Sequence, residues 1–553
     1  MNKNIFFFEI ILIILIIGLS IGLFIYLPSK TFPADDALIL FRYAEIFAET
    51  GVIAYNYGKL PVEGATDFLW MIILAVLNKF GIKTWAGSLF ISYISLLATA
   101  YIIYKLLETK KRVLFFLLII FFLMFKTNLS ALLGFSTLFF GLSILLCFYF
   151  EIKNKINYVF ILAFLTCLIR PDGFALVLPV IANVFFKKRI KISKIVFKFA
   201  LFFLLPGIIY FIWRFKYFGY LFPLPFYIKY YNKIINKESF IENIIFNLPF
   251  FIIILINYIY LLKNKININK NEIAFLILYF VFPFLFYSKI TLLQNVCNRF
   301  QHPFVIINFI ILVLIWKKYF LKKIIFFSLT SLIIYSTPYF YKAIGQIWLS
   351  QYENIYKVAF YFSKSIPKAL FLTTEAGIVP YYTKWETIDA FGLNTPAYTK
   401  KIITSEDVKK LSPDIVLINY MWDLYNIIDY AKEENKDAQQ KTWQGMIHNI
   451  VKGLDDDNYN IILLPVYNCD EIKKIKKEKF YRFMYIGKNF EYYYDKMYYC
   501  FFIKKNFNYA SVVENILYML GGLSYKNFKN NIRPTIEQQL RSLNLLPNVS
   551  PHN

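Results

Sequence analysis

The chain has 553 residues, of which 58% are hydrophobic and 17% are charged, and its mean hydropathy is +0.50. Soluble globular chains contain about 45–50% apolar residues, so this composition excludes an ordinary soluble protein and favours a polytopic membrane protein. The formal net charge of +26 is assigned to cytoplasmic loops and to the C-terminal third, in keeping with the positive-inside rule. We therefore expect no nucleic-acid partner.

Apolar runs recur before residue 340 and predict membrane helices, several of them short enough to be broken or half-inserted. The first run, Ile5 to Leu27, predicts an uncleaved span, because no small-residue cleavage site follows it. Counting every run as a full span conflicts with the cytoplasmic basic cluster that starts at Lys105, so we expect about 11 spans. The later runs lie near residues 68–80, 86–104, 113–125, 131–150, 157–169, 173–186, 195–213, 245–262, 272–288, 303–316 and 324–337.

The sequence pattern of the chain changes after residue 338. Strand-like runs at 369–373, 414–419, 461–466 and 498–503 alternate with helical segments at 354–365 and 426–434. We expect an α-helical membrane domain over residues 1–338 and an extracytoplasmic, soluble α/β domain over residues 339–553. Cys469 and Cys500 fall in the second domain, where they either pair as a disulfide or stay apart.

The first predicted outer loop, residues 29–67, carries the most informative pattern. Ala37 to Thr50 has the periodicity of an amphipathic helix, and Gly51 is a natural stop. Asp35 and Asp36 stand at the start of this helix. One reading is an N-cap that satisfies free amide groups, and the other is a general base pointing into a membrane-facing cavity.

Cationic side chains recur near the predicted outer face, where each is either a snorkelling residue at a helix end or a ligand for an anion. Arg170 lies in the sequence Leu-Ile-Arg-Pro-Asp-Gly, which breaks a helix, and Asp172 could simply pair with it. The aromatic segment Tyr217–Lys229 predicts an irregular interfacial loop, since two prolines and a glycine oppose a regular helix. The cations are Arg42, Arg170, Arg214, Lys216, Lys229 and Arg299, with His302 beside the last.

An Asp-Asp pair, an aromatic-Arg-Tyr-Ala helix and the motif Val-Glu-Gly-x-Thr-x-Phe-Leu-Trp follow one another in this order. The order resembles the integral-membrane, GT-C type transferases related to the actinobacterial terminal β-(1→2)-arabinofuranosyltransferase. Weaker similarities continue to about residue 395, and departures at Asp67 and at Leu224–Pro225 leave the sugar and the acceptor open. The matching residues of the first motif are Asp35, Asp36, Arg42, Tyr43, Ala44, Val62, Glu63, Gly64, Thr66, Phe68, Leu69 and Trp70.

The resemblance implies a polyprenyl-phosphate sugar donor, an acidic catalytic residue in the first outer loop, and inversion at the anomeric carbon. On this basis Asp36 is the expected general base, while Asp35 orients it, binds the sugar or helps to hold a divalent ion. The expected ligands of the donor phosphate are Arg170, Lys229, Arg299, Arg214 and His302. Arg42, Tyr43, Glu63 and Thr66 are expected to order the loop or contact the sugar, and Glu375, Tyr381 and Tyr382 to lie on the acceptor side.

The expected function is thus transfer of a sugar to a cell-envelope glycan or glycolipid on the outer face of the bacterial cytoplasmic membrane. A protein O-mannosyltransferase-like or lipid A sugar transferase would share the chemistry with a different acceptor. A flippase for lipid-linked sugars would perform no bond chemistry and is expected to show inverted repeats, which the sequence does not display. No cofactor is certain, although Mg²⁺ or Mn²⁺ is compatible with the two adjacent aspartates.

Overall fold

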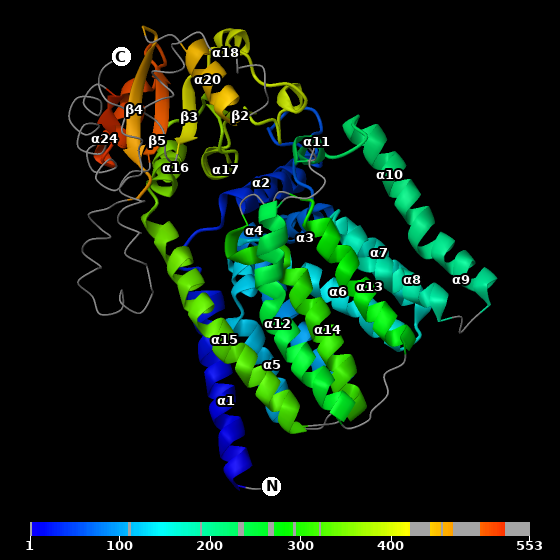
Figure 1. The fold of residues 1–553 in the computed structure, drawn as a ribbon. Helices are drawn as coiled ribbons and strands as arrows, with labels where there is room; N and C mark the ends of the chain where they lie inside the picture. The colour runs from blue at the N-terminus through cyan, green and yellow to red at the C-terminus, as the bar shows by residue number, and fades with distance from the viewer. Residues whose placement is uncertain are drawn as a thin grey trace, which may run out of the picture. The chain divides into compact units, whose positions relative to one another are not determined.

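The computed structural model describes residues 3–108, 112–187, 191–229, 237–263, 270–290, 295–319, 322–420, 443–454, 457–467 and 498–525. The chain folds into two compact units (Figure 1). We call them the helical unit, which comprises Met1–Pro33, Tyr43–Gly51 and Ala65–Trp348, and the sheet unit, which comprises Ala34–Arg42, Val52–Gly64 and Leu349–Asn553. Two pieces of the first loop therefore fold with the C-terminal unit, and that unit begins at Leu349 rather than at residue 339.

The helical unit consists of helices joined by short connections, and α2 (Asp35–Thr50) carries the chain from the sheet unit into it. Its other elements are α1 (Lys3–Ile21), η1 (Gly22–Tyr26), α3 (Phe68–Lys79), α4 (Thr84–Leu106), α5 (Arg112–Met124), η2 (Lys126–Leu133), α6 (Thr137–Ile152), α7 (Ile156–Ile169), α8 (Gly173–Phe186), α9 (Ile192–Phe199), η3 (Ala200–Leu204), α10 (Leu205–Phe218), α11 (Leu224–Lys229), α12 (Lys237–Lys263), α13 (Lys270–Tyr287), η4 (Val296–Gln301), α14 (His302–Tyr319) and α15 (Lys322–Leu349).

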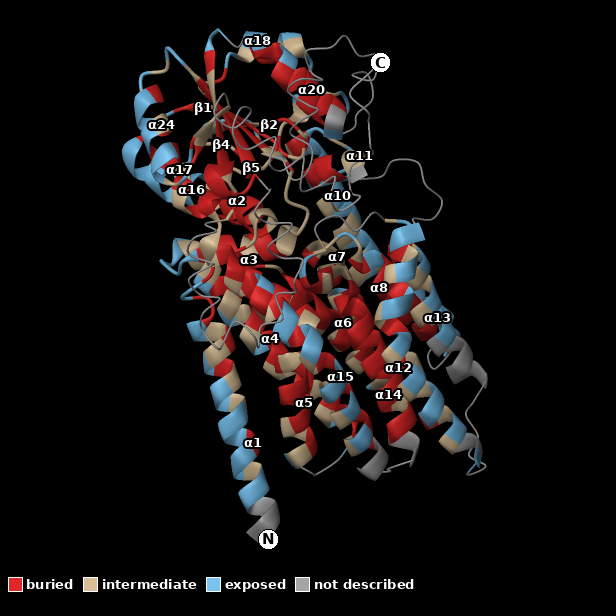
Figure 2. Ribbon diagram, turned by 60° about the vertical axis from the view of Figure 1, so that its left-hand side comes forward, coloured by how far each residue is buried: buried red, intermediate tan, exposed pale blue. Residues whose placement is uncertain are grey.

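Several of these helices are long and apolar enough to cross a membrane, which confirms that part of the expected fold. Within the described residues they are Phe7–Tyr26, Thr84–Leu106, Ile192–Phe218, Lys237–Tyr260 and Val296–Trp316. A sixth span forms if α5 and η2 count as one bent helix, and shorter apolar helices accompany them. The total of about 11 spans stays a prediction. The most apolar stretch of Val296–Trp316 is 89% buried inside the protein, whereas that of Ile192–Phe218 is 6% buried. Helix α14 is therefore central in the helical unit, and α10 is peripheral (Figure 2).

Two expectations about this unit need correction. The apolar run 131–150 is not one helix, because Gly134 adopts a left-handed conformation (φ 98°) that ends η2 before α6 begins at Thr137. The segment Tyr217–Lys229 is not wholly irregular either. Gly219 ends α10 in the left-handed region, and the short helix α11 then forms with Pro225 in its first turn, where proline is tolerated.

The sheet unit is built on a mixed six-stranded sheet of order β2-β1-β3-β5-β4-β6. β1, β2 and β3 run parallel to one another, while β5, β4 and β6 continue the sheet with antiparallel pairing. Four of the strands were expected from sequence, whereas β2 and β6 were not. The strands are β1 (Leu370–Thr373), β2 (Glu386–Asp389), β3 (Ile415–Tyr420), β4 (Tyr459–Pro465), β5 (Tyr498–Lys504) and β6 (Leu523–Ser524).

Helices cover both faces of this sheet, as the alternation of side chains along its strands requires. Leu372 and Phe502 belong to a buried core with residues of α18 and α20, whereas Phe501, the neighbour of Phe502, lies edge-on to Phe362 of α16. The helices are η5 (Ser350–Tyr352), α16 (Asn354–Ser365), α17 (Ile378–Thr383), η6 (Pro396–Tyr398), α18 (Ser405–Leu411), α20 (Trp443–Gly453) and α24 (Ala510–Met519). The expected helix 426–434 and Cys469 lie outside the described residues, and Cys500 is buried in β5.

Candidate functional site

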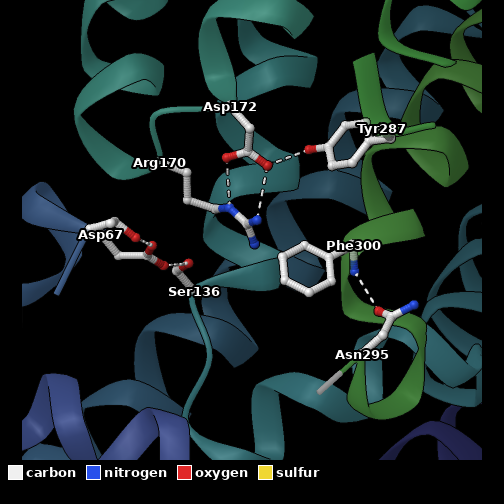
Figure 3. Close-up of polar contacts among 8 residues, drawn as sticks. Asp67, Ser136, Arg170, Asp172, Tyr287, Asn295 and Phe300 are labelled. Carbon is white, nitrogen blue, oxygen red and sulfur yellow. Dashed lines mark hydrogen bonds and ion pairs between the residues drawn. The ribbon is translucent and has the colours of Figure 1, made fainter. Parts of the chain in front are cut away.

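Arg170 lies at a break between two apolar helices of the helical unit. Pro171 cannot continue α7, and the backbone of Arg170 is extended (φ −148°, ψ 139°). The guanidinium donates 2.9 Å hydrogen bonds from Nε and Nη2 to the two oxygens of Asp172, which also accepts one from the hydroxyl of Tyr287 (Figure 3). Asp172 is thus a partner of Arg170, and Nη1 of Arg170 has no hydrogen-bond partner among the residues that the structure describes.

Arg299 lies in η4, directly before the buried helix α14. Its guanidinium carbon is 3.8 Å from the ring centroid of Phe135 and 5.0 Å from that of Phe300. The ring of Phe300 also lies 5.2 Å from the guanidinium carbon of Arg170, so one aromatic ring contacts both arginines. Cys297 and Asn298 hold left-handed backbone conformations (φ 55° each) just before Arg299. Such strain costs about 1–3 kcal/mol per residue and gathers at functional sites.

A carboxylate, Asp67, belongs to the same group of side chains. It precedes α3, and its Oδ2 accepts a 2.6 Å hydrogen bond from the hydroxyl of Ser136. The charges of Arg170 and Arg299 both act on Asp67. No hydrogen bond joins Asp67 directly to Arg170 within the described ranges, so the two are near one another without forming an ion pair. We call Asp67, Arg170, Asp172 and Arg299 the arginine cluster.

A network of polar side chains that sequence reasoning missed surrounds η4. Nζ of Lys126 donates to Oδ1 of Asn298 (2.5 Å), and the amide nitrogens of Asn298 and Asn295 donate to Oε1 of Glu242 (2.5 and 2.7 Å). Lys126 follows an apolar run just as a snorkelling lysine does, so its position in the sequence does not mark it as functional. Glu242, a carboxylate within the apolar helix α12, carried the one available signal, since such residues are rare and functional.

The other predicted phosphate ligands have partners elsewhere in the helical unit. Arg214 is buried, and its Nη1 donates a 2.8 Å hydrogen bond to the carbonyl of Leu221, which holds the turn after α10. His302 is buried with Nδ1 3.1 Å from the hydroxyl of Thr127. Lys229 is the last residue of α11. The structure thus groups Arg170 with Arg299, and the charge of Arg170 also acts on His302, whereas Arg214 does not join this set of contacts.

In the sheet unit, polar side chains gather where the parallel strands end. Glu375 follows β1, Asp389 is the last residue of β2, and Asn419 lies near the end of β3. The amide of Asn419 donates a 2.9 Å hydrogen bond to Oε1 of Glu375. Open α/β sheets bind their ligands outside the carboxyl ends of parallel strands, so this edge is a second candidate site.

Asp35 reaches the same edge from the first loop. Its Oδ1 accepts a 2.6 Å hydrogen bond from the backbone N–H of Ile378, the first residue of α17. The carbonyl of Ala34 accepts the first hydrogen bonds of α2, so Asp35 does not cap its own helix; instead it caps α17. Gly377 permits this approach, because a Cβ there would overlap the backbone oxygen of Asp35. Asp36 is half-buried beside it.

Arg42 ties the first loop to the sheet unit. Its guanidinium donates to the carbonyls of Tyr55 (2.5 Å), Trp385 (2.8 Å) and Pro380, and to Oδ1 of Asn56 (2.9 Å). Only 3% of Arg42 is exposed. Of its two expected roles, these contacts favour ordering the loop over contact with a sugar.

Arg42→Met is expected to destabilise the sheet unit by on the order of 3 kcal/mol, because hydrogen bonds to charged groups contribute about 1.5–3 kcal/mol each. Thermal unfolding of the purified protein would measure the loss. Lys59→Met is the matched control in the same loop. Lys59 forms an exposed pair with Glu386, with side chains 54% and 41% exposed, and such pairs contribute about 0–1 kcal/mol. Equal shifts for both variants would contradict the role of Arg42.

Burial governs the charge of the carboxyl groups at this edge. It raises the pKa of Asp35 to about 7, aided by the negative charge of Asp36 and opposed by the hydrogen bond from Ile378. Burial also raises the pKa of Glu353 to about 7, and it raises the pKa of Glu375 and of Asp389 above their ordinary values. Asp35 and Glu353 therefore change charge near neutral pH.

We expect the stability of the sheet unit to fall as the pH rises from about 4 to about 7. Unfolded carboxyl groups titrate near pH 4, whereas folded Asp35 and Glu353 titrate near 7. The folded state therefore binds more protons in this interval, and its stability decreases with pH. Thermal unfolding across the interval would measure the slope, and Asp35→Asn should flatten part of it. A stability that increases over this interval would contradict the assignment.

The remaining predicted residues are spread over both units. Tyr43 and Glu63 are buried, and the hydroxyl of Thr66 lies 3.4 Å from Oδ1 of Asp67. Tyr381 lies edge-on to Tyr382, with ring centroids 5.1 Å apart. In the described part of the chain, no group of three or more His, Cys, Asp or Glu side chains is placed to hold a metal ion.

A family model for a domain of unknown function (DUF8728) matches residues 345–462. The matched segment runs from the end of α15 into β4 and includes the parallel strands with Glu375, Asp389 and Asn419. No curated protein and no solved structure matches the chain. The sheet unit is therefore similar, over this segment, to a family whose description names no activity.

Proposed function

We propose that the protein is an inverting glycosyltransferase of the membrane-embedded GT-C type. It would take a sugar from a polyprenyl-phosphate donor and transfer it to a cell-envelope glycan or glycolipid. The reaction would occur on the outer face of the bacterial cytoplasmic membrane, with about 11 spans and with the sheet unit extracytoplasmic. Arg170 carries this proposal, because it is a guanidinium at a break between apolar helices with one nitrogen, Nη1, left without a hydrogen-bond partner in the described residues.

The chemistry of the arginine cluster supports an anionic ligand. A phosphate accepts paired hydrogen bonds from the planar guanidinium fork, which makes arginine the preferred residue for phosphate recognition. Asp172 holds Arg170 through Nε and Nη2, and Phe300 contacts the guanidinium groups of both Arg170 and Arg299. Both cations are thus fixed before a ligand arrives, so little reorganisation is needed to stabilise a departing phosphate.

The carboxyl groups of the sheet unit support the acceptor half of the reaction. A hydroxyl acceptor must lose its proton as it attacks, and a carboxylate within hydrogen-bond reach takes that proton. Asp36 is our proposed base. Asp35, whose own carboxylate accepts a hydrogen bond from the N–H of Ile378, is proposed to orient it. Glu375, Tyr381 and Tyr382 would bind the acceptor at the carboxyl ends of the strands.

In the proposed reaction, the acceptor oxygen forms a bond to the anomeric carbon while its proton passes to Asp36. The bond between the anomeric carbon and the phosphate oxygen breaks, and polyprenyl phosphate leaves with the electron pair. Attack from the face opposite the leaving group inverts the anomeric configuration. The developing charge on the phosphate is stabilised by Arg170 and Arg299, and a divalent ion held by Asp35 and Asp36 would be a compatible addition.

Release of polyprenyl phosphate tests the proposal. Purified protein in detergent is incubated with synthetic polyprenyl-phosphate sugars and a candidate glycan acceptor, and the lipid products are separated. Acceptor-dependent release of polyprenyl phosphate is the expected result. Movement of intact donor across vesicle membranes without its cleavage would instead identify a flippase. Analysis of the glycosylated product separates a glycan acceptor from a protein or lipid A acceptor.

A further inference from the structure

The arginine cluster balances its own charge. Arg170 and Arg299 contribute two positive charges, and Asp67 and Asp172 contribute two negative charges when ionised. Asp172 is bound to Arg170 in a bidentate pair. Asp67 instead accepts hydrogen bonds from neutral hydroxyls, that of Ser136 at 2.6 Å and that of Thr66 at 3.4 Å, although both guanidinium groups act on it electrostatically. The two carboxylates are therefore not equivalent, and Asp67 is the less firmly paired one.

A phosphate that enters this cluster adds at least one negative charge to a group whose formal charge is already zero. Burying an uncompensated charge is strongly unfavourable, so a group nearby is expected to change its protonation instead. Asp172 cannot easily do so, because it accepts two hydrogen bonds from Arg170 and a third from Tyr287. Asp67 can, since protonation leaves one of its oxygens free to accept the hydrogen bond from Ser136.

We propose that Asp67 is the counter-ion that sets the affinity of the arginine cluster for a phosphate group, and that the phosphate binds together with one proton taken up by Asp67. This inference rests on the proposed function, because it takes the arginine cluster as the phosphate site. Asp67 acts through the charge of Arg170 and Arg299, so it is a positioning residue and does not react itself.

Burial favours the neutral form of Asp67 and raises its pKa, while Arg170 is the strongest opposing charge and Arg299 a weaker one; the charge of Asp172 raises it further. Among the described residues, other titratable groups that interact with the cluster include His302, on which the charge of Arg170 acts, Tyr287, bound to Asp172, Cys167, near Asp172, and Cys297, near Arg299. When the pH exceeds the pKa of Asp67 in the free protein, coupled proton uptake weakens phosphate binding by up to about tenfold per pH unit. The phosphate itself titrates near pH 6, so only the difference between protein variants isolates Asp67.

The test is a binding titration of polyprenyl phosphate to the full-length protein in detergent, between about pH 6 and pH 9. The wild-type Kd should rise with pH more steeply than that of Asp67→Asn, and the variant should bind more tightly at the high-pH end. Ser136→Ala removes the hydrogen bond that favours ionised Asp67, so the Kd of this variant should begin to rise at a higher pH. Glu151→Gln is the matched control, because Glu151 is a buried carboxylate of the same unit that pairs with Lys187 (2.5 Å). The Kd of Glu151→Gln should rise with pH as steeply as that of the wild type.

If the Kd values of the wild type and Asp67→Asn rise equally steeply with pH, Asp67 is not the counter-ion proposed here. If Arg299→Gln abolishes phosphate binding while the Kd values of the wild type and Asp67→Asn depend on pH in the same way, only this inference fails and the proposed function stands. No binding by the wild type at any pH would sink both. A parallel titration with inorganic phosphate separates the two sources of the ligand: weak binding supports a lipid headgroup, and equal binding with the same dependence on Asp67 supports the proton coupling but assigns it to free phosphate.

Discussion

Asp36→Asn is expected to lower the rate of sugar transfer by about 10²–10⁴-fold, which is the usual contribution of a general base. The amide is nearly isosteric with the carboxylate but cannot accept the proton of the acceptor hydroxyl. Asp36 is half-buried in the first turn of α2, so the substitution leaves the packing of the helix intact. Rates would be measured as polyprenyl phosphate released at saturating donor, and the thermal unfolding of the variant should match that of the wild type.

Asp35→Asn separates catalysis from folding at the same place. An asparagine can still accept the hydrogen bond from Ile378, so α17 keeps its cap and some transfer should remain. Full activity of Asp36→Asn would remove Asp36 from the mechanism. If Asp35→Asn were inactive while Asp36→Asn was active, the roles of the two aspartates would be exchanged.

The strands and helices that sequence reasoning located are those with local signals. The short runs rich in aliphatic and aromatic residues became β1, β3, β4 and β5, and the predicted helix 354–365 is α16 with the same limits. β2 was missed because Glu386–Asp389 contains one large apolar residue, Ile388, among polar ones. It adopts a strand conformation because it pairs with β1, and the local sequence pattern does not predict this contact.

The contacts of the candidate site also differ in how far the sequence predicts them. The pairing of Arg170 with Asp172 could be anticipated, since the two residues are two positions apart at a helix break. The cap that Asp35 provides to α17 and the bonds from Arg42 to Pro380 and Trp385 join residues more than 330 positions apart. Sequence spacing carries no information about such contacts. The joint action of Asp36 and the arginine cluster in one reaction stays a prediction.

Arg170→Lys is expected to lower kcat/KM for the donor by roughly 10²-fold, the scale of losing one donor to a developing oxyanion. Arg170 has two tasks that need the guanidinium fork: Nε and Nη2 bind Asp172, and Nη1 is available to the phosphate. A lysine ammonium can pair with Asp172 or with the phosphate, but it cannot hold both in the planar geometry of a guanidinium. Donor titrations at fixed acceptor would separate the effects on KM and on kcat.

Arg214→Lys is the matched control for this prediction. Arg214 is also a buried arginine of the helical unit, but its Nη1 donates to the backbone carbonyls of Tyr220 and Leu221, of which Leu221 is the nearer at 2.8 Å. One ammonium satisfies such an acceptor, so this variant should keep most of its transfer activity and lose mainly thermal stability. If Arg214→Lys lost donor affinity as Arg170→Lys does, the phosphate would bind beyond the arginine cluster. If neither variant lost it, Arg170 would serve only to pair with Asp172 at the break between α7 and α8, and it would not contribute to donor binding.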